Sequence, residues 1–221
     1  MTSATFEAVD TYIEKLFIGE DPVLAAALAA AAAAGMPDIQ VSAVQGKFLY
    51  LLAKMIGAKR ILELGTLAGY STIWLARALP DDGQLVTCEY DQKHAKVARG
   101  NLDRAGLGEK VEIITGAALE TLPKLVARNG QPFDLVFLDA DKNNYSNYLD
   151  WALKLTRSGS FIIADNVVRG GAVLAPKKGD AFTNGARDFN AKLAADPRLE
   201  AIVLQSIGAK GHDGLAYARV K

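Results

Sequence analysis

Residues 61–72 read Ile61-Leu62-Glu63-Leu64-Gly65-Thr66-Leu67-Ala68-Gly69-Tyr70-Ser71-Thr72. An apolar run, two closely spaced glycines and a polar start predict a strand, a tight turn and a helix, which is how many α/β domains bind a nucleotide-type ligand. In the dinucleotide pattern G-x-G-x-x-G, the middle glycine lets the backbone approach a pyrophosphate. Leu67 stands at that position, so the segment lacks the pyrophosphate seat.

Short apolar runs alternate with amphipathic stretches from residue 60 onward. The strand candidates are residues 61–64, 84–89, 111–115, 133–138 and 160–164. Each is brief and apolar on both sides, as parallel strands covered by helices on both faces should be. The alternation predicts a doubly wound α/β sheet, with ligands at the carboxyl ends of the strands.

The two ends of the chain add to this core. Residues 1–55 are expected to form an N-terminal helical addition to a core of residues 56–221, all within one domain. Val23 to Ala34 is alanine-rich and too short to cross a bilayer, and Asp21 and Gly35 provide the start and stop of a packed helix. After residue 185 we expect one helix to about residue 195 and an antiparallel strand pair, 199–207 and 214–220, at the sheet edge.

Composition excludes some classes of protein. The 25 basic and 25 acidic side chains cancel, whereas a dedicated nucleic-acid binder needs a basic surplus. Cys88 is the single cysteine, and the first twenty residues lack the pattern of a secretory signal. We therefore expect a cytoplasmic protein without nucleic-acid or membrane partners. Cys88, Trp74 and Trp151 are expected to pack in the interior. His94 and His212 are not accompanied by other residues in a metal-ligand pattern.

An acidic side chain ends the second predicted strand. Glu89 lies 26 residues after Glu63, where a carboxylate can accept hydrogen bonds from both hydroxyls of a ribose. An adenosine-bearing ligand without phosphates fits, and S-adenosylmethionine is such a ligand. Glycine-loop amides, Ser71 and waters ordered by Glu63 can hold its zwitterionic end. The alternative is that Gly65 and Gly69 only allow close strand–helix packing.

Two further strands also end in acidic residues. Asp139-Ala140-Asp141-Lys142 follows residues 133–138, and Asp165-Asn166 follows residues 160–164. Asp139, Asp165 and Asn166 offer three hard oxygen ligands, which suits Mg²⁺ or a similar cation better than zinc. The alternative is that these residues cap helices and turns.

These motifs together resemble the cation-dependent class I O-methyltransferases of the caffeoyl-CoA and catechol type. The resemblance is carried by E-L-G-T-L-A-G-Y-S, by Glu89, by F-D-L-V-F-L-D-A-D-K-N-N-Y and by the Asp165-Asn166 pair. It extends from Val41-Ser42-Ala43 to the final strand pair. It implies a Rossmann-like methyltransferase fold with seven strands in the order 3-2-1-4-5-7-6, the last strand being antiparallel.

The resemblance also implies roles for residues of this chain. Those expected to bind S-adenosylmethionine are Val41, Glu63, Gly65, Thr66, Ser71, Glu89, Ala118, Asp139 and Asp141. The metal, Mg²⁺ or alternatively Mn²⁺ or Ca²⁺, would be held by Asp139, Asp165 and Asn166. Asp139 and Lys142 are the catalytic candidates, with Lys142 as general base. Lys142 could instead be a surface lysine or a salt-bridge partner of a neighbouring aspartate.

The implied function is methyl transfer from S-adenosylmethionine to a hydroxyl of a small vicinal dihydroxy aromatic, by a homodimer. Residues 165–171 depart from the D-N-T-L-W-N-G of plant caffeoyl-CoA enzymes, which speaks against caffeoyl-CoA itself. The loop of residues 167–184 is glycine-rich, and Arg169 within it either meets a carboxylate on the acceptor or lies in solvent. A methyltransferase with a non-catechol acceptor and a non-catalytic adenosine-ligand binding protein are the alternative functions.

Overall fold

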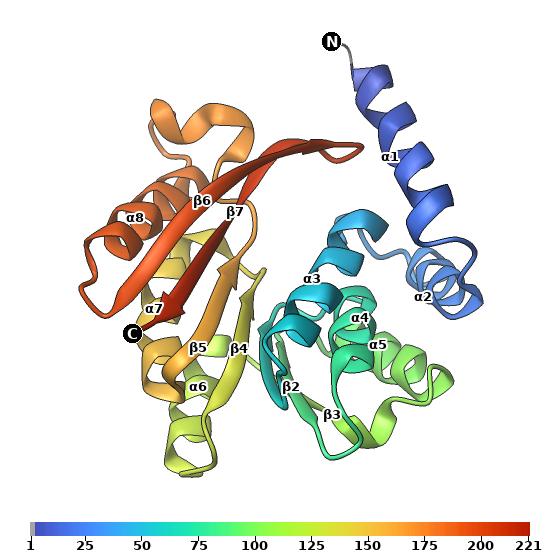
Figure 1. Cartoon of the computed structure of the whole chain (residues 1–221), viewed down its shortest axis with the longest axis horizontal. Coiled ribbons are helices and arrows are strands. Elements are labelled where there is room, and N and C mark those ends of the chain that lie inside the picture. The colour runs from blue at the N-terminus through green and yellow to red at the C-terminus, as the bar shows by residue number, and fades with distance from the viewer. Residues whose placement is uncertain (1–2) are drawn as a thin grey trace.

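The centre of the fold is a seven-stranded sheet with the strand order β3-β2-β1-β4-β5-β7-β6 (Figure 1). The structure is a computed structural model and describes residues 3–221. Its strands are β1 Arg60–Leu64, β2 Gln84–Glu89, β3 Val111–Thr115, β4 Phe133–Leu138, β5 Thr156–Ala164, β6 Leu199–Gly208 and β7 Gly211–Val220. The first five strands are parallel, and β7 runs antiparallel to β5 and to β6. The predicted fold class and strand order are confirmed.

The register of the parallel strands brings four strand ends together. Leu64, at the end of β1, is level with Cys88 of β2 and with Leu138 of β4, and Leu138 is level with Ala164 of β5. The residues that follow these four are Gly65, Glu89, Asp139 and Asp165. The residues singled out from the sequence therefore emerge at one edge of the sheet, as the parallel arrangement requires.

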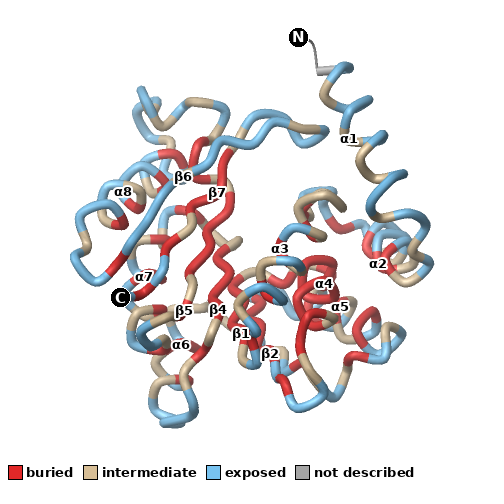
Figure 2. Tube along the Cα trace, viewed as in Figure 1, coloured by how far each residue is buried: buried red, intermediate tan, exposed pale blue. Residues whose placement is uncertain are grey.

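Helices cover both faces of the sheet. They are α1 Ser3–Phe17, α2 Pro22–Ala33, α3 Ala43–Met55, α4 Tyr70–Ala78, α5 Gln92–Arg104, α6 Ala118–Ala127, α7 Tyr145–Leu155 and α8 Ala181–Ala195, with short 3-10 turns η1 Gly108–Lys110, η2 Lys142–Asn144 and η3 Arg169–Leu174. One buried cluster joins the sheet to α6, α7 and α8, and a second joins it to α3, α4 and α5. Figure 2 shows the buried central strands between these layers. Burial on both faces explains why the strands read as continuous apolar runs.

Helix α2 begins as the sequence predicts. The Asp21 carboxylate accepts hydrogen bonds from the backbone N–H groups of Val23 and Leu24, both at 3.1 Å, which caps α2. Arg77 on α4 donates to the same carboxylate and ties α2 to the core. Helix α1 lies beside the end of the β6–β7 hairpin (Figure 1), where Asp10 accepts a hydrogen bond from the backbone N–H of Ala209 at 2.6 Å. Across residues 3–221, no helix combines the length and the apolar character needed to cross a membrane.

Several strand and helix boundaries differ from the sequence prediction. β5 begins at Thr156, before the predicted start at residue 160, and the prediction missed residues 156–159 because they are polar or glycine and carry no apolar pattern. The β6–β7 hairpin also extends beyond the predicted strands, to Gly208 and Gly211, through residues that are largely exposed. Helix α8 begins at Ala181, where Asp180 caps it, and runs through Gly185. A side chain at Gly185 would meet the Lys142 carbonyl oxygen at 2.3 Å, so this glycine allows α8 to pack closely against η2 and does not mark a loop.

Candidate active site

The glycine loop between β1 and α4 packs tightly against the end of β4. Gly65 has a φ of +96°, and a Cβ atom there would lie 2.2 Å from the backbone oxygen of Asp139. Only glycine fits both restrictions. The N–H of Asp139 in turn donates to the Leu64 carbonyl at 2.8 Å, so the loop and the first acidic strand end are held together.

Glu89 holds this loop from the neighbouring strand. One of its carboxylate oxygens accepts hydrogen bonds from the backbone N–H groups of Thr66 and Leu67, at 3.1 and 2.8 Å. The other accepts from the Asp91 N–H at 2.9 Å and lies 3.6 Å from the His94 ring. Glu89 therefore lines the site and also fixes the conformation of the glycine loop.

Glu63 lies beneath the loop and has no exposed surface. Its two carboxylate oxygens accept hydrogen bonds from the hydroxyls of Ser71 and Thr72, at 2.7 and 2.5 Å. Burial raises the pKa of Glu63 to about 7, despite these hydrogen bonds. Ser71 itself lines the cavity described below, so Glu63 reaches a ligand there only through Ser71 or a water molecule.

Asp139 and Lys142 form an ion pair at the end of β4. Lys142 Nζ donates to Asp139 Oδ1 at 2.7 Å, and the two side chains are 11 % and 19 % exposed. Burial raises the pKa of Asp139, although the Lys142 ammonium opposes the shift. The salt-bridge alternative considered for Lys142 is thus present in the structure, and the same lysine lines the cavity.

Asp141 is held from helix α7. Its carboxylate accepts hydrogen bonds from the Asn144 amide at 2.5 Å and from the Tyr148 hydroxyl. Burial and this carboxylate raise the pKa of Tyr148, so the phenol stays protonated as the donor. Asp141 is therefore fixed, with Asn144 and Tyr148, on the side of the cavity toward α7.

Asp165 and Asn166 follow β5. Asp165 accepts a hydrogen bond from the side-chain amide of Gln45, on α3, at 2.6 Å. Burial and the negative charge of Asp139 raise the pKa of Asp165 to about 7. Asn166 has a φ of +57°, a left-handed conformation that asparagine tolerates better than most residues. The turn places Asn166 at the cavity wall, while Asp165 lies just behind it.

The donor set fits a hard divalent cation. Asp139 and Asp165 repel each other electrostatically, and Asn166 adds an amide oxygen, so a cation bound among them would offset the repulsion. Residues 3–221 contain no cluster of three or more histidine, cysteine, aspartate or glutamate side chains placed to hold a metal. A metal here would consequently need Asn166 and oxygens from water or a ligand to complete its coordination.

A cavity of about 770 Å³ joins these elements. The predicted residues that line it are Val41, Gly65, Thr66, Ser71, Glu89, Ala118, Asp139, Asp141, Lys142 and Asn166. Two predicted residues, Glu63 and Asp165, are buried outside its wall. One large hollow therefore has the glycine loop along one side and the acidic strand ends along another.

The structure adds cavity residues that were not predicted from the sequence. They include Ile39, Gln40, Tyr70, Tyr90, Asn144, Tyr148 and Phe182, and His94 also lies there although it was set aside. The i, i+3 and i+7 spacing of Asp141, Asn144 and Tyr148, which runs from the end of β4 into α7, could have indicated that Asn144 and Tyr148 are partners of Asp141. The others come from segments that only the folded chain brings to the cavity. Cys88 is buried as expected, and Trp74 and Trp151 pack against the core.

The fold, the glycine loop and the acidic edge define a methyltransferase of the S-adenosylmethionine-dependent class. A family model described as O-methyltransferase matches residues 17–220. Catechol O-methyltransferase of Niastella koreensis is 54 % identical over 221 residues, covering 100 % of both chains. Catechol O-methyltransferase of Mycobacterium tuberculosis is 52 % identical over 213 residues, covering 96 % of this chain and 95 % of the relative.

A solved structure shows the same similarity. The O-methyltransferase from Bacillus cereus in complex with SAH superposes with a TM-score of 0.98 at 48 % identity, covering 100 % of both chains. The chain therefore belongs to the O-methyltransferase family, and it is an enzyme of that family.

Proposed function

We propose that this enzyme transfers a methyl group from S-adenosylmethionine to one hydroxyl of a small vicinal dihydroxy aromatic acceptor, with a divalent cation. The observation that supports this most strongly is that two parts of the fold, the glycine loop and the acidic strand ends, line the same cavity. The glycine loop with Glu89 borders it on one side, and Asp139, Asn166 and Lys142 border it on another. The names of the two catechol O-methyltransferase relatives agree with this acceptor class.

The methyl donor is proposed to lie along the glycine loop. SAH, the product of methyl donation, is bound in the Bacillus cereus relative. The adenosine ribose would lie near Glu89, with Thr66 and Ala118 close by, and the amino acid end near Ser71 and Val41. Glu63 would act on that end through Ser71, because its carboxylate already accepts a hydrogen bond from the Ser71 hydroxyl at 2.7 Å.

The cation is proposed to bind between Asp139, Asp165 and Asn166, with Mg²⁺ as the first candidate. When bound, such an ion supplies positive charge that favours the phenolate form of the acceptor and orients two neighbouring oxygens. Gln45 orients Asp165 through its 2.6 Å hydrogen bond, and Asp139 is fixed by its backbone bond to β1. The chain thus prepares the oxygen ligands on two rigid strand ends.

Lys142 is the proposed proton acceptor. Its amine lies at the cavity wall beside Asp139, where the hydroxyl of an acceptor would lose its proton. The ammonium that donates to Asp139 must lose one proton before it can accept another. Displacement at the methyl carbon then depends mainly on positioning donor and acceptor in line.

The test is methyl transfer from labelled S-adenosylmethionine to a pair of isomers. Catechol has neighbouring hydroxyls and resorcinol does not, so the proposal predicts product with catechol and little with resorcinol. Equal rates for the two would contradict a vicinal acceptor. Cofactor binding without any product over a wide acceptor panel would favour the binding-protein alternative, and product with other hydroxyl compounds alone would favour a non-catechol acceptor.

We also propose that the enzyme is a homodimer, because an apolar face is left exposed. On β6, Ile202 and Leu204 are 61 % and 53 % exposed and lie on the sheet face that carries α3, since their partners on β7 are Tyr217 and Leu215. On α3, Met55 is 80 % exposed. A second copy of the chain would cover such a surface. The cytoplasmic location stays a prediction.

A further inference from the structure

Arg169 is a basic residue of the cavity wall without a side-chain partner. It lies three residues after Asn166, and both residues line the same cavity. Its Nε atom is buried and has no hydrogen-bond partner, and no described side chain forms an ion pair with its guanidinium. Leaving a buried N–H group of a cation unpaired is costly, and the side chain that carries it lies in the cavity wall.

The backbone at Arg169 is held in a special conformation. Its φ is +57°, and the two glycines that follow also have positive φ values. One carboxylate oxygen of Asp213 accepts hydrogen bonds from the N–H groups of Val168, Arg169 and Gly214, at 3.0, 2.8 and 2.9 Å. These bonds fix the turn, and the rest of the fold sustains a conformation that a non-glycine residue rarely adopts.

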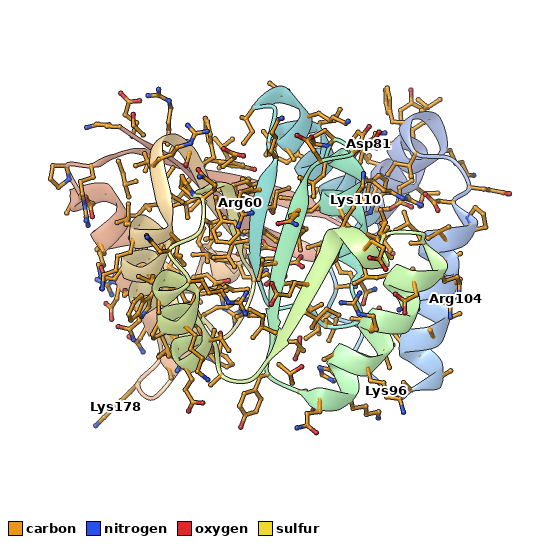
Figure 3. The ribbon with its side chains drawn as sticks, turned by 90° about the horizontal axis from the view of Figure 1, so that it is seen from below. Arg60, Asp81, Lys96, Arg104, Lys110 and Lys178 are labelled. Atoms are coloured by element: carbon orange, nitrogen blue, oxygen red, sulfur yellow. The ribbon has the colours of Figure 1, made fainter. Side chains whose placement is uncertain are left out.

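Asp180 is an acidic side chain close enough to feel Arg169: hydrogen bonds from Thr183 and, to a smaller extent, the charge of Arg169 lower the pKa of Asp180, although the two side chains form no ion pair. Asp180 caps α8, and its two carboxylate oxygens accept hydrogen bonds from the N–H and the hydroxyl of Thr183, at 3.0 and 2.6 Å. The other basic residues of this segment, Lys177 and Lys178, are exposed, and Lys178 points away from the protein in Figure 3. Arg169 is therefore the basic residue of residues 167–184 that lines the cavity.

We propose that the guanidinium of Arg169 binds a carboxylate on the methyl acceptor, so that the preferred acceptors are vicinal dihydroxy aromatic acids. A planar guanidinium matches a carboxylate with two parallel N–H···O bonds, and Arg169 lines the cavity without an ion-pair partner among the described residues. The inference rests on the proposed function and adds a substrate class to it. Of the two alternatives that the sequence leaves open for Arg169, the inference is the one in which this residue contacts the acceptor.

The first test compares two acceptors that differ in charge and hardly in shape, 3,4-dihydroxybenzoate and 3,4-dihydroxybenzamide. For the unaltered enzyme, kcat/KM for the acid should exceed that for the amide by about ten- to a hundredfold, the range of one charge-assisted hydrogen-bonded pair. Arg169→Gln should remove this preference by raising KM for the acid and leave the amide nearly unaffected. Lys178→Gln, which removes an exposed charge from the same segment, should keep the preference.

The second test measures binding directly and does not require turnover. Calorimetric titration of SAH-loaded protein with 3,4-dihydroxybenzoate should show at least about tenfold weaker binding to Arg169→Gln than to the unaltered protein or to Lys178→Gln. Equal affinity in all three proteins, or an acid-to-amide ratio that Arg169→Gln leaves unchanged, would overturn the proposal. If neither compound is methylated, the proposed function fails, and the titration still decides whether Arg169 binds the carboxylate.

Discussion

Lys142 Nζ lies 2.7 Å from Asp139 Oδ1, and both side chains are largely buried at the end of β4. Asp139 is also a predicted metal ligand, so the candidate base and the candidate metal site share one carboxylate. The Lys142 backbone packs against Gly185 of α8, which fixes the position of the lysine from behind. Proton acceptance and metal binding are therefore expected to depend on each other.

Lys142→Met should lower kcat by about a hundredfold or more, the usual contribution of a positioned general base. Methionine keeps the apolar stem of the side chain, so donor affinity measured by calorimetry should change little. Lys154→Met, which removes an exposed lysine from α7, serves as the control and should keep normal activity. If Lys142 is only a salt-bridge partner, its variant will lose thermal stability and keep its kcat.

Gly65→Ala should weaken binding of S-adenosylmethionine and lower the melting temperature. The added Cβ would lie 2.2 Å from the Asp139 carbonyl and would force the loop away from β4. Gly106→Ala is the matched control, because Gly106 also has a positive φ, +70°, but no atom within 4 Å of the added carbon. The free energy of unfolding of the control should fall only by the cost of a left-handed backbone at alanine, about 1–2 kcal/mol. Equal donor affinity in the two variants would contradict the packing role of Gly65.

Glu63 should make the stability of the free protein depend on pH. Its folded-state pKa of about 7 exceeds its ordinary value of 4.5, because burial disfavours the charged form. The folded state then binds the extra proton, and its contribution to stability is lost as pH rises from about 4.5 to about 7, by up to about 3 kcal/mol. Urea unfolding at pH 5 and pH 8 measures this loss.

Glu63→Gln should reduce the slope of this part of the pH profile, since glutamine does not titrate, and Asp165, whose pKa is also raised to about 7, should account for slope that remains. The same variant should bind S-adenosylmethionine more weakly, because the Ser71 hydroxyl loses its charged acceptor. A variant with an unchanged pH slope would show that other groups cause the dependence.

The sequence predicts most of this site, for identifiable physical reasons. Glu89, Asp139 and Asp165 stand at the ends of apolar runs in the sequence. Because parallel strands end at one edge of a sheet, the sequence predicts that these residues lie close together. Tyr148 and Phe182 could not, because a side chain on a covering helix reaches the cavity only through tertiary packing. Gly185 misled the prediction of α8, since a glycine required for close helix packing reads locally like a loop residue.

The apolar face offers a test of assembly. Ile202→Glu combined with Leu204→Glu should convert a dimer to a monomer in light scattering after gel filtration, since two charges would have to be buried at the interface. Ala201→Glu is the control, because Ala201 is also exposed but points to the opposite face of the sheet. A monomer for the unaltered protein, or a dimer for the double variant, would contradict the proposed interface.

The central claim is that methyl transfer requires a divalent cation held by Asp139, Asp165 and Asn166. The most direct test measures methylation of catechol after EDTA treatment and again as Mg²⁺ is added, for the unaltered enzyme and for Asp165→Ala. The account predicts that activity disappears with EDTA, returns with saturating dependence on Mg²⁺ and does not return in Asp165→Ala, although both proteins bind S-adenosylmethionine. Full activity in EDTA, or equal Mg²⁺ dependence in the variant, would contradict it.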